Sequence, residues 1–393
     1  MKISFFSNFL TPHQLYFSNS IMKFDDVDYT FVANIPFNSG EVADSFEDMN
    51  KLPFVLETYK SRENEEKALE LAADSDILIC GSSDERYVKA ALDNDVLVLR
   101  YSERILKKGT FHALSPRARF NVKKYHTDNM DKKMYMLCSS AYTAADFSRF
   151  GAYKRKTYKW GYFPETKHYQ MDALYAQKDK QKILWVGRFL DWKHPDDVLR
   201  VAKRLKEDGY SFSMDIAGTG EMEQQLKDMS EAMGLNDCVT FLGPIPSNRV
   251  RELMEKAGIY LFTSDRYEGW GAVLNESMNS GCAVVASHAI GAVPYLMRNQ
   301  ENGLIYHSGN VDELYKKVKY LLDNPGEQER LGKAAYETIV GEWNAEVAAE
   351  RLINLSEHLL AGEKYPDLYR TGPCSRAEII KDDWFYEYRT ATL

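Results

Sequence analysis

The sequence predicts an α/β protein built from two Rossmann-like domains, each with a parallel sheet. Short apolar runs alternate with longer amphipathic segments, as they do in βα units whose strands are buried on both faces. A polar stretch rich in Lys and Gln, residues 165–182, interrupts this alternation near the middle of the chain. The chain has 393 residues, 44% of them hydrophobic, and is therefore long enough to form two cores.

The first series of predicted strands occupies the N-terminal half. Its strands are the runs KISFFS, YTFVAN, DILIC, VLVLR and YMLCSS. Helices are predicted between them at 62–73, 84–92, 116–127 and 141–150. We therefore expect an N-terminal domain over residues 1–164. It ends in an aromatic run that is expected to pack a hinge, formed by Trp160, Gly161, Tyr162 and Phe163.

The second series begins after the predicted linker, residues 165–182. Its strands are KILWVG, SFSMDIAG, CVTFLG, IYLFTS and CAVVAS. Its closing helices are predicted at 311–322, 327–340 and 344–360. The C-terminal domain is thus expected over 183–360, and the aromatic tail 361–393 is expected to pack back on the body.

Composition predicts a cytoplasmic protein. Polar residues such as Asn8 and His13 interrupt the first apolar run too early for a signal peptide. No later run approaches the roughly 20 apolar residues that a membrane helix needs. The cysteines are odd in number and scattered, which is typical of buried thiols in a reducing compartment. They are Cys80, Cys138, Cys238, Cys282 and Cys374.

Charge is unevenly distributed along the chain. The net charge is −8, yet residues 100–160 contain fifteen Lys and Arg against four acidic residues. A basic face on an acidic protein can attract anionic lipid headgroups or a phosphate-bearing substrate. Peripheral contact with the inner face of an anionic membrane is therefore one interpretation, and an ordinary solvated face is the other. Nucleic acid is not expected, because no recognition motif accompanies the charge.

Polar residues that follow predicted strands outline a candidate site. Ligands of open parallel sheets bind at the carboxyl ends of the strands. The strand KILWVG is followed by Arg188 and Lys193, two cations placed where a loop can hold phosphates. The strand IYLFTS is followed by a turn in which Gly269 and Gly271 permit close backbone approach, and a helix begins near Ala272. Together these features predict a diphosphate site.

Two glutamates frame this turn. Glu268 precedes it, and Glu276 lies about one turn into the predicted helix. Carboxylates accept hydrogen bonds from paired sugar hydroxyls, so one glutamate could hold a ribose and the other a transferred sugar. The alternative is that Glu268 complements the helix dipole and Glu276 is a solvated surface residue. Spacing alone leaves both interpretations open.

These residues belong to a longer series of motifs. The motifs are VGRFLDWKHP, IAGTGEMEQQL, VTFLGPIPSNRVRELM and EGWGAVLNESMNSGCAVVASHAIGAVPYLMRNQENGLIY. Their order, and the Glu-x7-Glu signature at Glu268 and Glu276, closely resemble the retaining glycosyltransferases of family 4 over residues 181–360. The resemblance implies the GT-B fold, in which two Rossmann-like domains face each other across a deep cleft.

The resemblance also implies roles for individual residues. Arg188 and Lys193 match the cations that neutralise the donor diphosphate. Glu268 matches the residue that contacts hydroxyls of the donor sugar, and Glu276 matches the carboxylate that accepts from the ribose. With Glu103 of the first domain, Arg188, Lys193 and Glu268 form the expected catalytic set. The other expected donor-binding residues are Gly187, Gly243, Pro244, Ile245, Gly269, Trp270, Gly271 and Ala272.

The implied activity is transfer of a sugar from a nucleotide diphosphate, with a UDP-sugar favoured, to a hydroxyl of a saccharide or glycolipid acceptor. The anomeric configuration would be retained, and surface polysaccharide or glycolipid assembly is the expected context. Neither a metal nor another cofactor is expected, because the family usually needs none and no Asp/His ligand cluster stands out. The alternatives are a catalytically inert nucleotide-sugar-binding partner of an active enzyme and a sugar-nucleotide epimerase of the same fold.

The N-terminal domain departs from the family pattern. The run SNFLTPHQ replaces the Gly-Gly turn of many relatives, so residues 8–13 are expected to line the site with other contacts. Glu103 follows the strand VLVLR, where many relatives have a histidine. It is predicted to touch the donor sugar or the acceptor. The alternative is an ion pair with a neighbouring cation, which would be Arg100, Arg104 or Lys107.

Histidines divide between the two domains. In the first domain His13, His112 and His126 are open candidates for contacts with substrate. In the second domain no catalytic partner accompanies any histidine in the sequence, so a structural role is expected for each. These are His194, His288 and His307.

Overall fold

The computed structural model describes residues 1–37 and 47–386. The chain divides into two compact units, each built around one sheet. The first unit contains Met1–Glu165 and Trp343–Lys381, and the second contains Thr166–Glu342 and residues 382–386, in each case for the described residues. This confirms the predicted α/β class with two Rossmann-like domains.

The sheet of the first unit has seven parallel strands in the order β3-β2-β1-β4-β5-β6-β7. The strands are β1 (Lys2–Ser7), β2 (Asp28–Ala33), β3 (Val55–Glu57), β4 (Ile77–Cys80), β5 (Leu97–Ser102), β6 (Met134–Cys138) and β7 (Thr157–Lys159). Strands β4 and β6 are buried along their whole length, as expected of a parallel sheet covered on both faces.

Among the described residues, five α-helices of the first unit precede the predicted linker, and the sequence predicts all but the first of them. They are α1 (Pro12–Ile21), α2 (Arg62–Asp74), α3 (Glu85–Asp93), α4 (Pro116–Tyr125) and α5 (Thr143–Ser148). The four helices predicted between the strands are confirmed as α2 to α5. Their apolar sides form one core with the sheet, in which Ala68 of α2 and Val88 of α3 pack near Leu78 of β4.

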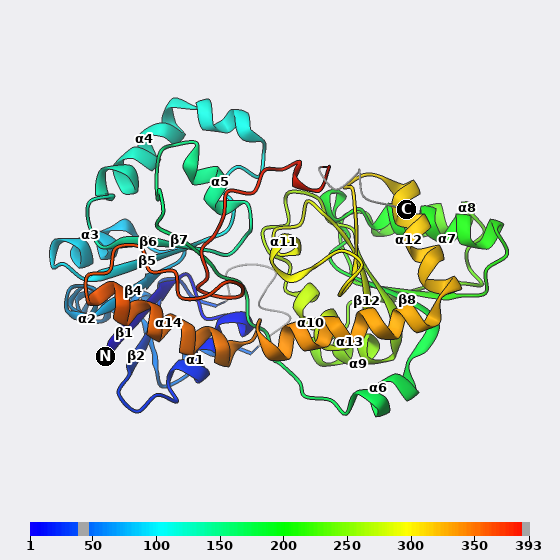
Figure 1. Ribbon diagram of the computed structural model, residues 1–393, viewed down its shortest axis with the longest axis horizontal. Helices are drawn as coiled ribbons and strands as arrows, with labels where there is room; N and C mark the ends of the chain where they lie inside the picture. Colours follow the sequence, from blue (N-terminus) through cyan, green and yellow to red (C-terminus); the bar gives the residue numbers. More distant parts are fainter. Residues whose placement is uncertain (38–46, 387–393) are drawn as a thin grey trace. The chain divides into compact units, whose positions relative to one another are not determined.

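Helix α14 (Ala345–Leu360) belongs to the first unit, whereas the sequence predicts that it closes the second domain. Its buried stripe includes Leu352, Leu355 and Leu359, and the helix packs against α1 (Figure 1). The 3.6-residue period shows that one face is buried but not which domain covers it. That information lies in long-range packing, which a local pattern does not contain.

The C-terminal part of the chain covers the edge strand β7. The N–H of Cys374 donates to the carbonyl of Lys159 at 2.8 Å, and the N–H of Ala377 donates to that of Thr157 at 3.0 Å. An exposed edge would leave a row of backbone groups unpaired, and this pairing satisfies them. Residues up to 381 belong to the first unit, while residues 387–393 of the predicted tail lie outside the described part of the chain.

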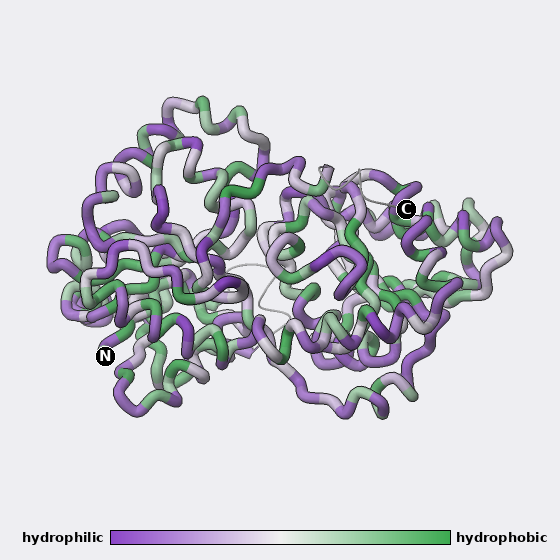
Figure 2. The backbone as a smooth tube through the Cα atoms, in the orientation of Figure 1, coloured by the Kyte–Doolittle hydropathy of each residue, from purple (hydrophilic) through white to green (hydrophobic). Residues whose placement is uncertain are grey.

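The sheet of the second unit has six parallel strands in the order β10-β9-β8-β11-β12-β13. They are β8 (Asp179–Val186), β9 (Ser213–Ala217), β10 (Val239–Gly243), β11 (Ala257–Phe262), β12 (Ala283–Ser287) and β13 (Leu304–Tyr306). The central strands run through the interior as hydrophobic segments (Figure 2). The predicted linker 165–182 differs from the structure, since it contains α6 (Met171–Gln177) and the start of β8.

The other helices of this unit cover its sheet. They are α7 (Pro195–Glu207), α8 (Glu223–Ala232), α9 (Ser247–Lys256), α10 (Val273–Asn279), α11 (Val293–Leu296), α12 (Val311–Asp323) and α13 (Pro325–Gly341). Helix α7 buries Val198 and Leu205 in the main core, and α12 buries Leu314 and Leu321 there. The predicted helices at 311–322 and 327–340 are confirmed as α12 and α13.

A buried ion pair fixes the segment that follows β5 in the first unit. Arg104 Nη2 donates to Asp146 Oδ1 at 3.3 Å, and the N–H of Leu106 donates to Asp146 Oδ2 at 2.8 Å. Both charged side chains are buried. Loss of either partner would leave a charge buried without its counterion, which is strongly unfavourable.

Replacement of this carboxylate is expected to destabilise the first unit. Asp146→Ala should lower the free energy of unfolding by about 3–5 kcal/mol, measured by urea denaturation. Asp74→Ala removes the exposed ion pair with Lys2 and serves as the control, which should leave the denaturation midpoint nearly unchanged. Equal effects of the two substitutions would contradict a structural role for the buried pair.

Candidate functional site

The predicted site residues of the second unit gather at one edge of its sheet. Arg188 and Lys193 follow β8, Glu268 follows β11, and residues 244–245 follow β10. Strands β8 and β11 are neighbours, and the direction of strand order reverses between them. Ligands of such sheets bind at this switch point. Because adjacent strands lie about 4.8 Å apart, roughly 14 Å separate the ends of β10 and β11, so one extended ligand can reach both loops.

Lys193 and Glu268 contact each other directly, although 75 positions separate them in the sequence. Lys193 Nζ donates to Glu268 Oε2 at 2.5 Å, and Ser264 Oγ donates to the same oxygen at 3.0 Å. The side chains of Lys193 and Glu268 are 13% and 12% exposed, so water screens the pair only weakly. The sequence predicts both charged residues, but neither their contact nor the role of Ser264 could be read from a local motif.

Backbone hydrogen bonds hold the loops after β8 and β11 together. Thr263 Oγ1 donates to the carbonyl of Lys193 at 2.6 Å, and Trp185 Nε1 donates to Thr263 Oγ1 at 2.9 Å. The N–H of Asp265 donates to the carbonyl of Trp192 at 2.9 Å. The backbone of Lys193 is therefore held in place independently of its ammonium group, which remains able to change partner.

His194 adds an ionisable contact between the same loops. Its Nε2 lies 3.4 Å from Asp265 Oδ2, and its backbone is left-handed with φ of 49°. The hydrogen bond with Asp265 raises the pKa of His194, and the nearby carboxylates of Asp196 and Asp197 act in the same direction against the effect of burial. His194 thus holds the loops together, in keeping with the structural role expected for it.

Glu268 and Glu276 both act on one buried phenol. Tyr260 lies in β11, and its Oη donates to the carbonyl of Val186 at 3.3 Å. Burial raises the pKa of Tyr260 well above its usual value, and the negative charges of Glu276 and Glu268 raise it further. Glu276 is half-buried on α10 rather than fully solvated. Both carboxylates of the Glu-x7-Glu signature therefore lie near enough to Tyr260 to disfavour its ionised form.

Glycine shapes the turn between these carboxylates. Gly271 has φ of +87°, and a Cβ there would lie 2.3 Å from the ring of Phe262 and 3.2 Å from Glu268 Cγ. Trp270 is buried, and its Nε1 donates to Asn275 Oδ1 at 2.9 Å, so its side chain packs the domain. Helix α10 has Ala272 as its N-cap and only seven residues. Its dipole is correspondingly short, and the cations supply most of the positive charge.

The remaining predicted donor residues lie along the same edge. Gly187 directly follows β8, and a Cβ there would lie 3.3 Å from Lys193 Cδ. Arg188 comes next and is exposed. Gly243 ends β10 with φ of +67°, and residues 244–245 continue that loop. Gly269 is buried in the turn after Glu268.

Glu103 lies in the first unit, directly after β5. Its Oε2 accepts from Lys107 Nζ at 2.6 Å, and its Oε1 accepts from Tyr162 Oη at 2.5 Å. The ion pair with Lys107 is one of the three pairings that the sequence left open. The other two cations are buried in ion pairs elsewhere. The contact with Tyr162 was not predicted, because the sequence assigned that ring only to packing of a hinge.

Tyr162 links Glu103 to His13. The rings of His13 and Tyr162 are stacked, with centroids 5.3 Å apart and planes inclined by 4°. Tyr101 of β5 lies 6.3 Å from Tyr162, centroid to centroid. Burial lowers the pKa of His13 to about 4, so its ring is neutral near pH 7. These four side chains form a polar and aromatic cluster at the carboxyl ends of β1 and β5.

The other two histidine candidates have different surroundings. His126 Nδ1 is hydrogen-bonded to Tyr153 Oη at 2.6 Å. Burial, and secondarily the charge of Arg100, lower the pKa of His126 to about 3. It caps the C-terminal end of α4, and its ring packs against Phe147 and Tyr153. His112 lies on the 3₁₀ helix η3 (Thr110–Leu114) and is exposed.

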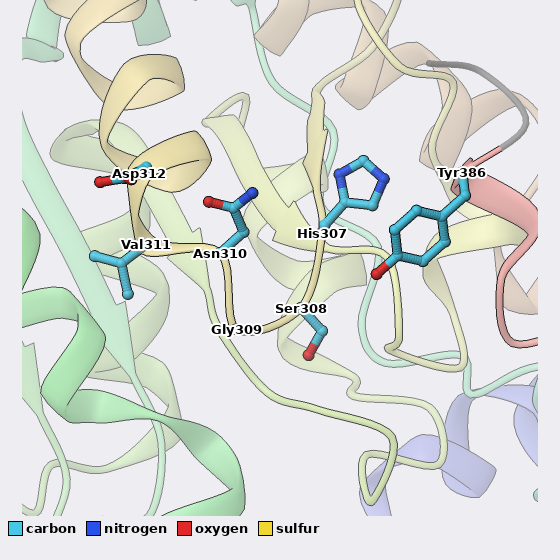
Figure 3. Close-up of a pocket in the computed structure, with 7 residues that line it drawn as sticks. All are labelled: His307, Ser308, Gly309, Asn310, Val311, Asp312 and Tyr386. Atoms are coloured by element: carbon cyan, nitrogen blue, oxygen red, sulfur yellow. The ribbon is translucent and has the colours of Figure 1, made fainter.

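A cavity of about 440 Å³ lies beyond β13 (Figure 3). The loop 307–312 and Tyr386 line it, and none of the predicted donor residues does so. The rings of His307 and Tyr386 are 4.4 Å apart, and His307 Nδ1 is hydrogen-bonded to Glu313 Oε2 at 2.6 Å. His307 is therefore engaged in packing, and the cavity is distinct from the predicted site.

The described residues contain neither a metal-ligand cluster nor a membrane-spanning helix. Over residues 1–37 and 47–386, no three His, Cys, Asp or Glu side chains gather in a way that could hold a metal ion. No helix in that part of the chain is long and apolar enough to cross a membrane. The five cysteines are free, and Cys238 is the one that is not fully buried.

Known proteins resemble the second unit in sequence. Residues 168–338 match the family model described as glycosyl transferases group 1. An uncharacterized glycosyltransferase of Haemophilus influenzae is 30% identical over 176 residues, which make up 43% of this chain and 49% of that protein. The amylovoran biosynthesis glycosyltransferase AmsK of Erwinia amylovora is 27% identical over 183 residues, 45% of each chain. The chain spans about half the length of the curated relatives it matches.

Solved structures resemble nearly the whole chain in fold. The structure of Anabaena Alr3699/HepE in complex with UDP superposes with a TM-score of 0.68 and 16% identity, and the match covers 90% of this chain and 99% of that one. At this identity the similarity establishes the fold alone, and that fold is the predicted GT-B fold. The sequence matches thus relate residues 168–338 to glycosyl transferases group 1, and the structural match relates nearly the whole chain to the GT-B fold.

Replacement of Gly271 is expected to destabilise the second unit more than replacement of Gly309. Both glycines have positive φ, +87° and +77°, so alanine is strained at each by about 1–2 kcal/mol. Only at position 271 would the new Cβ also meet other atoms closer than 3 Å. Urea denaturation of Gly271→Ala and Gly309→Ala measures the difference. Equal losses would show that Phe262 does not restrict this turn.

Stability is also expected to fall as pH rises above about 6.5, the usual pKa of histidine. The pKa of folded His194 is raised, so its ion pair with Asp265 stabilises the protein at lower pH and is lost as the ring deprotonates. His194→Asn keeps a residue that tolerates left-handed backbone and removes the titrating group. Unfolding free energies over a pH series should show a flatter profile in this variant, with His112→Asn as the control. An unchanged profile in His194→Asn would refute the assignment.

Proposed function

We propose that the protein is a retaining glycosyltransferase that moves a sugar from a UDP-sugar to a hydroxyl of a saccharide or glycolipid acceptor. The adjacency of β8 and β11, which brings Lys193 and Glu268 together at the switch point, carries this proposal. The group 1 match of residues 168–338 supports the class of reaction. UDP in the Anabaena structure supports the donor, and the name of the Erwinia relative supports a role in surface polysaccharide or glycolipid assembly.

In this proposal the cations of the β8 loop receive the donor diphosphate. Lys193 Nζ donates to Glu268 in the structure, and phosphate oxygens compete for the same ammonium group. Donor binding thus exchanges one ion pair for another. Glu268 keeps the hydrogen bond from Ser264 and becomes available to hydroxyls of the donor sugar. Arg188, exposed beside Gly187, adds a second positive charge.

The chemical step requires stabilisation of the leaving group. Negative charge builds on the diphosphate as the sugar–phosphate bond breaks, and Lys193 and Arg188 stabilise that charge. The acceptor hydroxyl attacks the anomeric carbon from the face that the diphosphate leaves, so configuration is retained. Its proton passes to the departing phosphate oxygen, which removes the need for a protein base. Glu276 accepts from the ribose, and residues 243–245 contact the base through backbone groups. No metal ion takes part.

We assign the acceptor to the polar and aromatic cluster of the first unit. Glu103 is a carboxylate whose charge Lys107 partly balances, so it can accept from a hydroxyl without being buried alone. The neutral ring of His13 and the phenol of Tyr162 can exchange hydrogen bonds with further hydroxyls. We place the protein in the cytoplasm, in peripheral contact with an anionic membrane through the basic region 100–160.

Donor binding and transfer, measured on the same variants, test this function. Thermal unfolding with UDP-, GDP- and ADP-sugars should show a higher midpoint with a UDP-sugar, because a ligand of the native state stabilises it. Glu276→Ala should lose that shift. Lys193→Met and Glu268→Gln should each lower the rate of sugar transfer, measured as UDP released in the presence of a panel of saccharide acceptors, by roughly two orders of magnitude or more. Lys182→Met is the matched control, since it breaks a 2.8 Å ion pair with Asp215 in the same sheet away from the site.

The outcomes separate the alternatives. A shift with only a GDP- or ADP-sugar would overturn the choice of UDP. Near-normal rates in both Lys193→Met and Glu268→Gln would defeat the assignment of these residues. Donor binding without any product would indicate an inert binding partner, and release of an altered nucleotide sugar without acceptor would indicate an epimerase.

A further inference from the structure

Residues 104–127 combine positive charge with exposed apolar side chains. This stretch contains seven Lys and Arg and no Asp or Glu. Phe111 is 84% exposed, Leu114 65%, Phe120 64% and Ile105 40%. Over the described part of the chain, Phe111 is the most exposed large hydrophobic side chain. A cluster of this kind marks an interaction surface, because isolated proteins usually keep such side chains from water.

The local structure turns two of these side chains to the same side. Phe111 and Leu114 lie three residues apart in η3, and side chains at i and i+3 of a 3₁₀ helix eclipse each other. Ala113, between them, is buried, so one side of η3 faces the body of the unit. Phe111 and Leu114 therefore project together from the surface.

Helix α4 adds a third apolar side chain beside basic ones. Phe120 shares a face with Arg117 and Lys124, which lie three residues before it and four after it. Val122 is buried on the other side of the helix. Long basic side chains next to an exposed ring can keep their charges in a polar layer while the ring enters an apolar one.

The structure also shows which cations of the basic region are available. Arg100 and Arg104 are buried in ion pairs, and Lys156 donates to two backbone carbonyls. These residues cannot contribute to a surface. The exposed cations around the apolar cluster include Lys108, Arg117, Arg119 and Lys124, while the exposed Lys123 is paired with Asp128.

A fixed base supports the exposed cluster. The buried carboxylate of Asp146 accepts from Arg104 and from the N–H of Leu106, and the Leu106 side chain is itself buried. The apolar side chains thus extend from an anchored segment. They do not need to be ordered from a free loop before they bind, so less conformational entropy is lost.

We propose, building on the membrane contact of the proposed function, that residues 105–124 form the surface that docks on anionic lipid bilayers. Phe111, Leu114 and Phe120 enter the boundary between headgroups and acyl chains, where apolar surface leaves water. The neighbouring cations bind the negatively charged headgroups. A symmetric dimer through this face would set two stretches of like charge against each other, and a soluble polyanion would account for the cations but not for the exposed phenylalanines. Lipid accounts for both.

Vesicle binding of the full-length protein, without donor, tests this surface. Flotation with vesicles of phosphatidylcholine alone and of phosphatidylcholine mixed with phosphatidylglycerol gives a partition coefficient. Binding is expected with the anionic vesicles, weaker at high salt, and little is expected with the neutral ones. Phe111→Ser/Leu114→Ser should lower the partition coefficient at least about tenfold at unchanged charge. Ile379→Ser is the matched control, because Ile379 is also 65% exposed and should not matter.

A second variant and further controls make the outcome decisive. Arg117→Gln/Arg119→Gln should weaken binding to anionic vesicles and leave the fold intact, as checked by circular dichroism. Unchanged vesicle binding in Phe111→Ser/Leu114→Ser, or equal binding to neutral and anionic vesicles, would overturn the proposal. Sedimentation velocity that shows a dimer which Phe111→Ser/Leu114→Ser abolishes would also overturn it. So would binding to heparin without binding to vesicles, which would indicate a soluble polyanion. The UDP-sugar shift in the same variant reports on the donor site separately.

Discussion

The parallel pairing of β8 with β11 is the constraint on which the candidate site depends. Ile183 pairs with Ile259 and Leu184 with Tyr260, so the loops after both strands leave the sheet at the same edge. A shift of one residue would exchange the side chains on the two faces of either strand, and both faces of β11 are closely packed. Apolar packing several residues away therefore fixes the position of Lys193 beside Glu268. The attraction between the two charges does not have to bring their loops together.

The ion pair at this edge suits a site that must receive a charged ligand. Burying a single ammonium or carboxylate group without a counterion costs roughly several kcal/mol. In the pair, the charge of Lys193 offsets that of Glu268 and reduces this cost. A phosphate can replace the carboxylate as partner of Lys193 with no change in the number of paired charges. Ser264 keeps a hydrogen bond to Glu268, and hydroxyls of the donor sugar can donate to the same carboxylate, so its oxygens keep hydrogen-bond partners during the exchange.

The identities of these residues could be predicted, whereas their contacts could not. Arg188, Lys193 and Glu268 each follow an apolar run within a recognisable motif, and strand runs depend on neighbouring residues. The contact between Lys193 and Glu268 joins positions 75 residues apart, and the contact of Tyr162 with Glu103 joins positions 59 apart. Helix α14 shows the same limit at the level of domains. Its apolar stripe predicts that one face is buried, but the helix that covers this face is α1, at the other end of the chain.

Charge along the sequence is subject to the same limit. Arg104 and Arg117 lie close together in one basic segment, yet Arg104 is buried against Asp146, 42 residues away, and Arg117 is exposed. Only the fold separates cations that hold the protein together from cations that face outward. The outward ones lie beside Phe111 and Phe120, and positive charge alone would fit any polyanion. The exposed rings beside this positive charge favour a lipid bilayer, which offers anionic headgroups above an apolar layer.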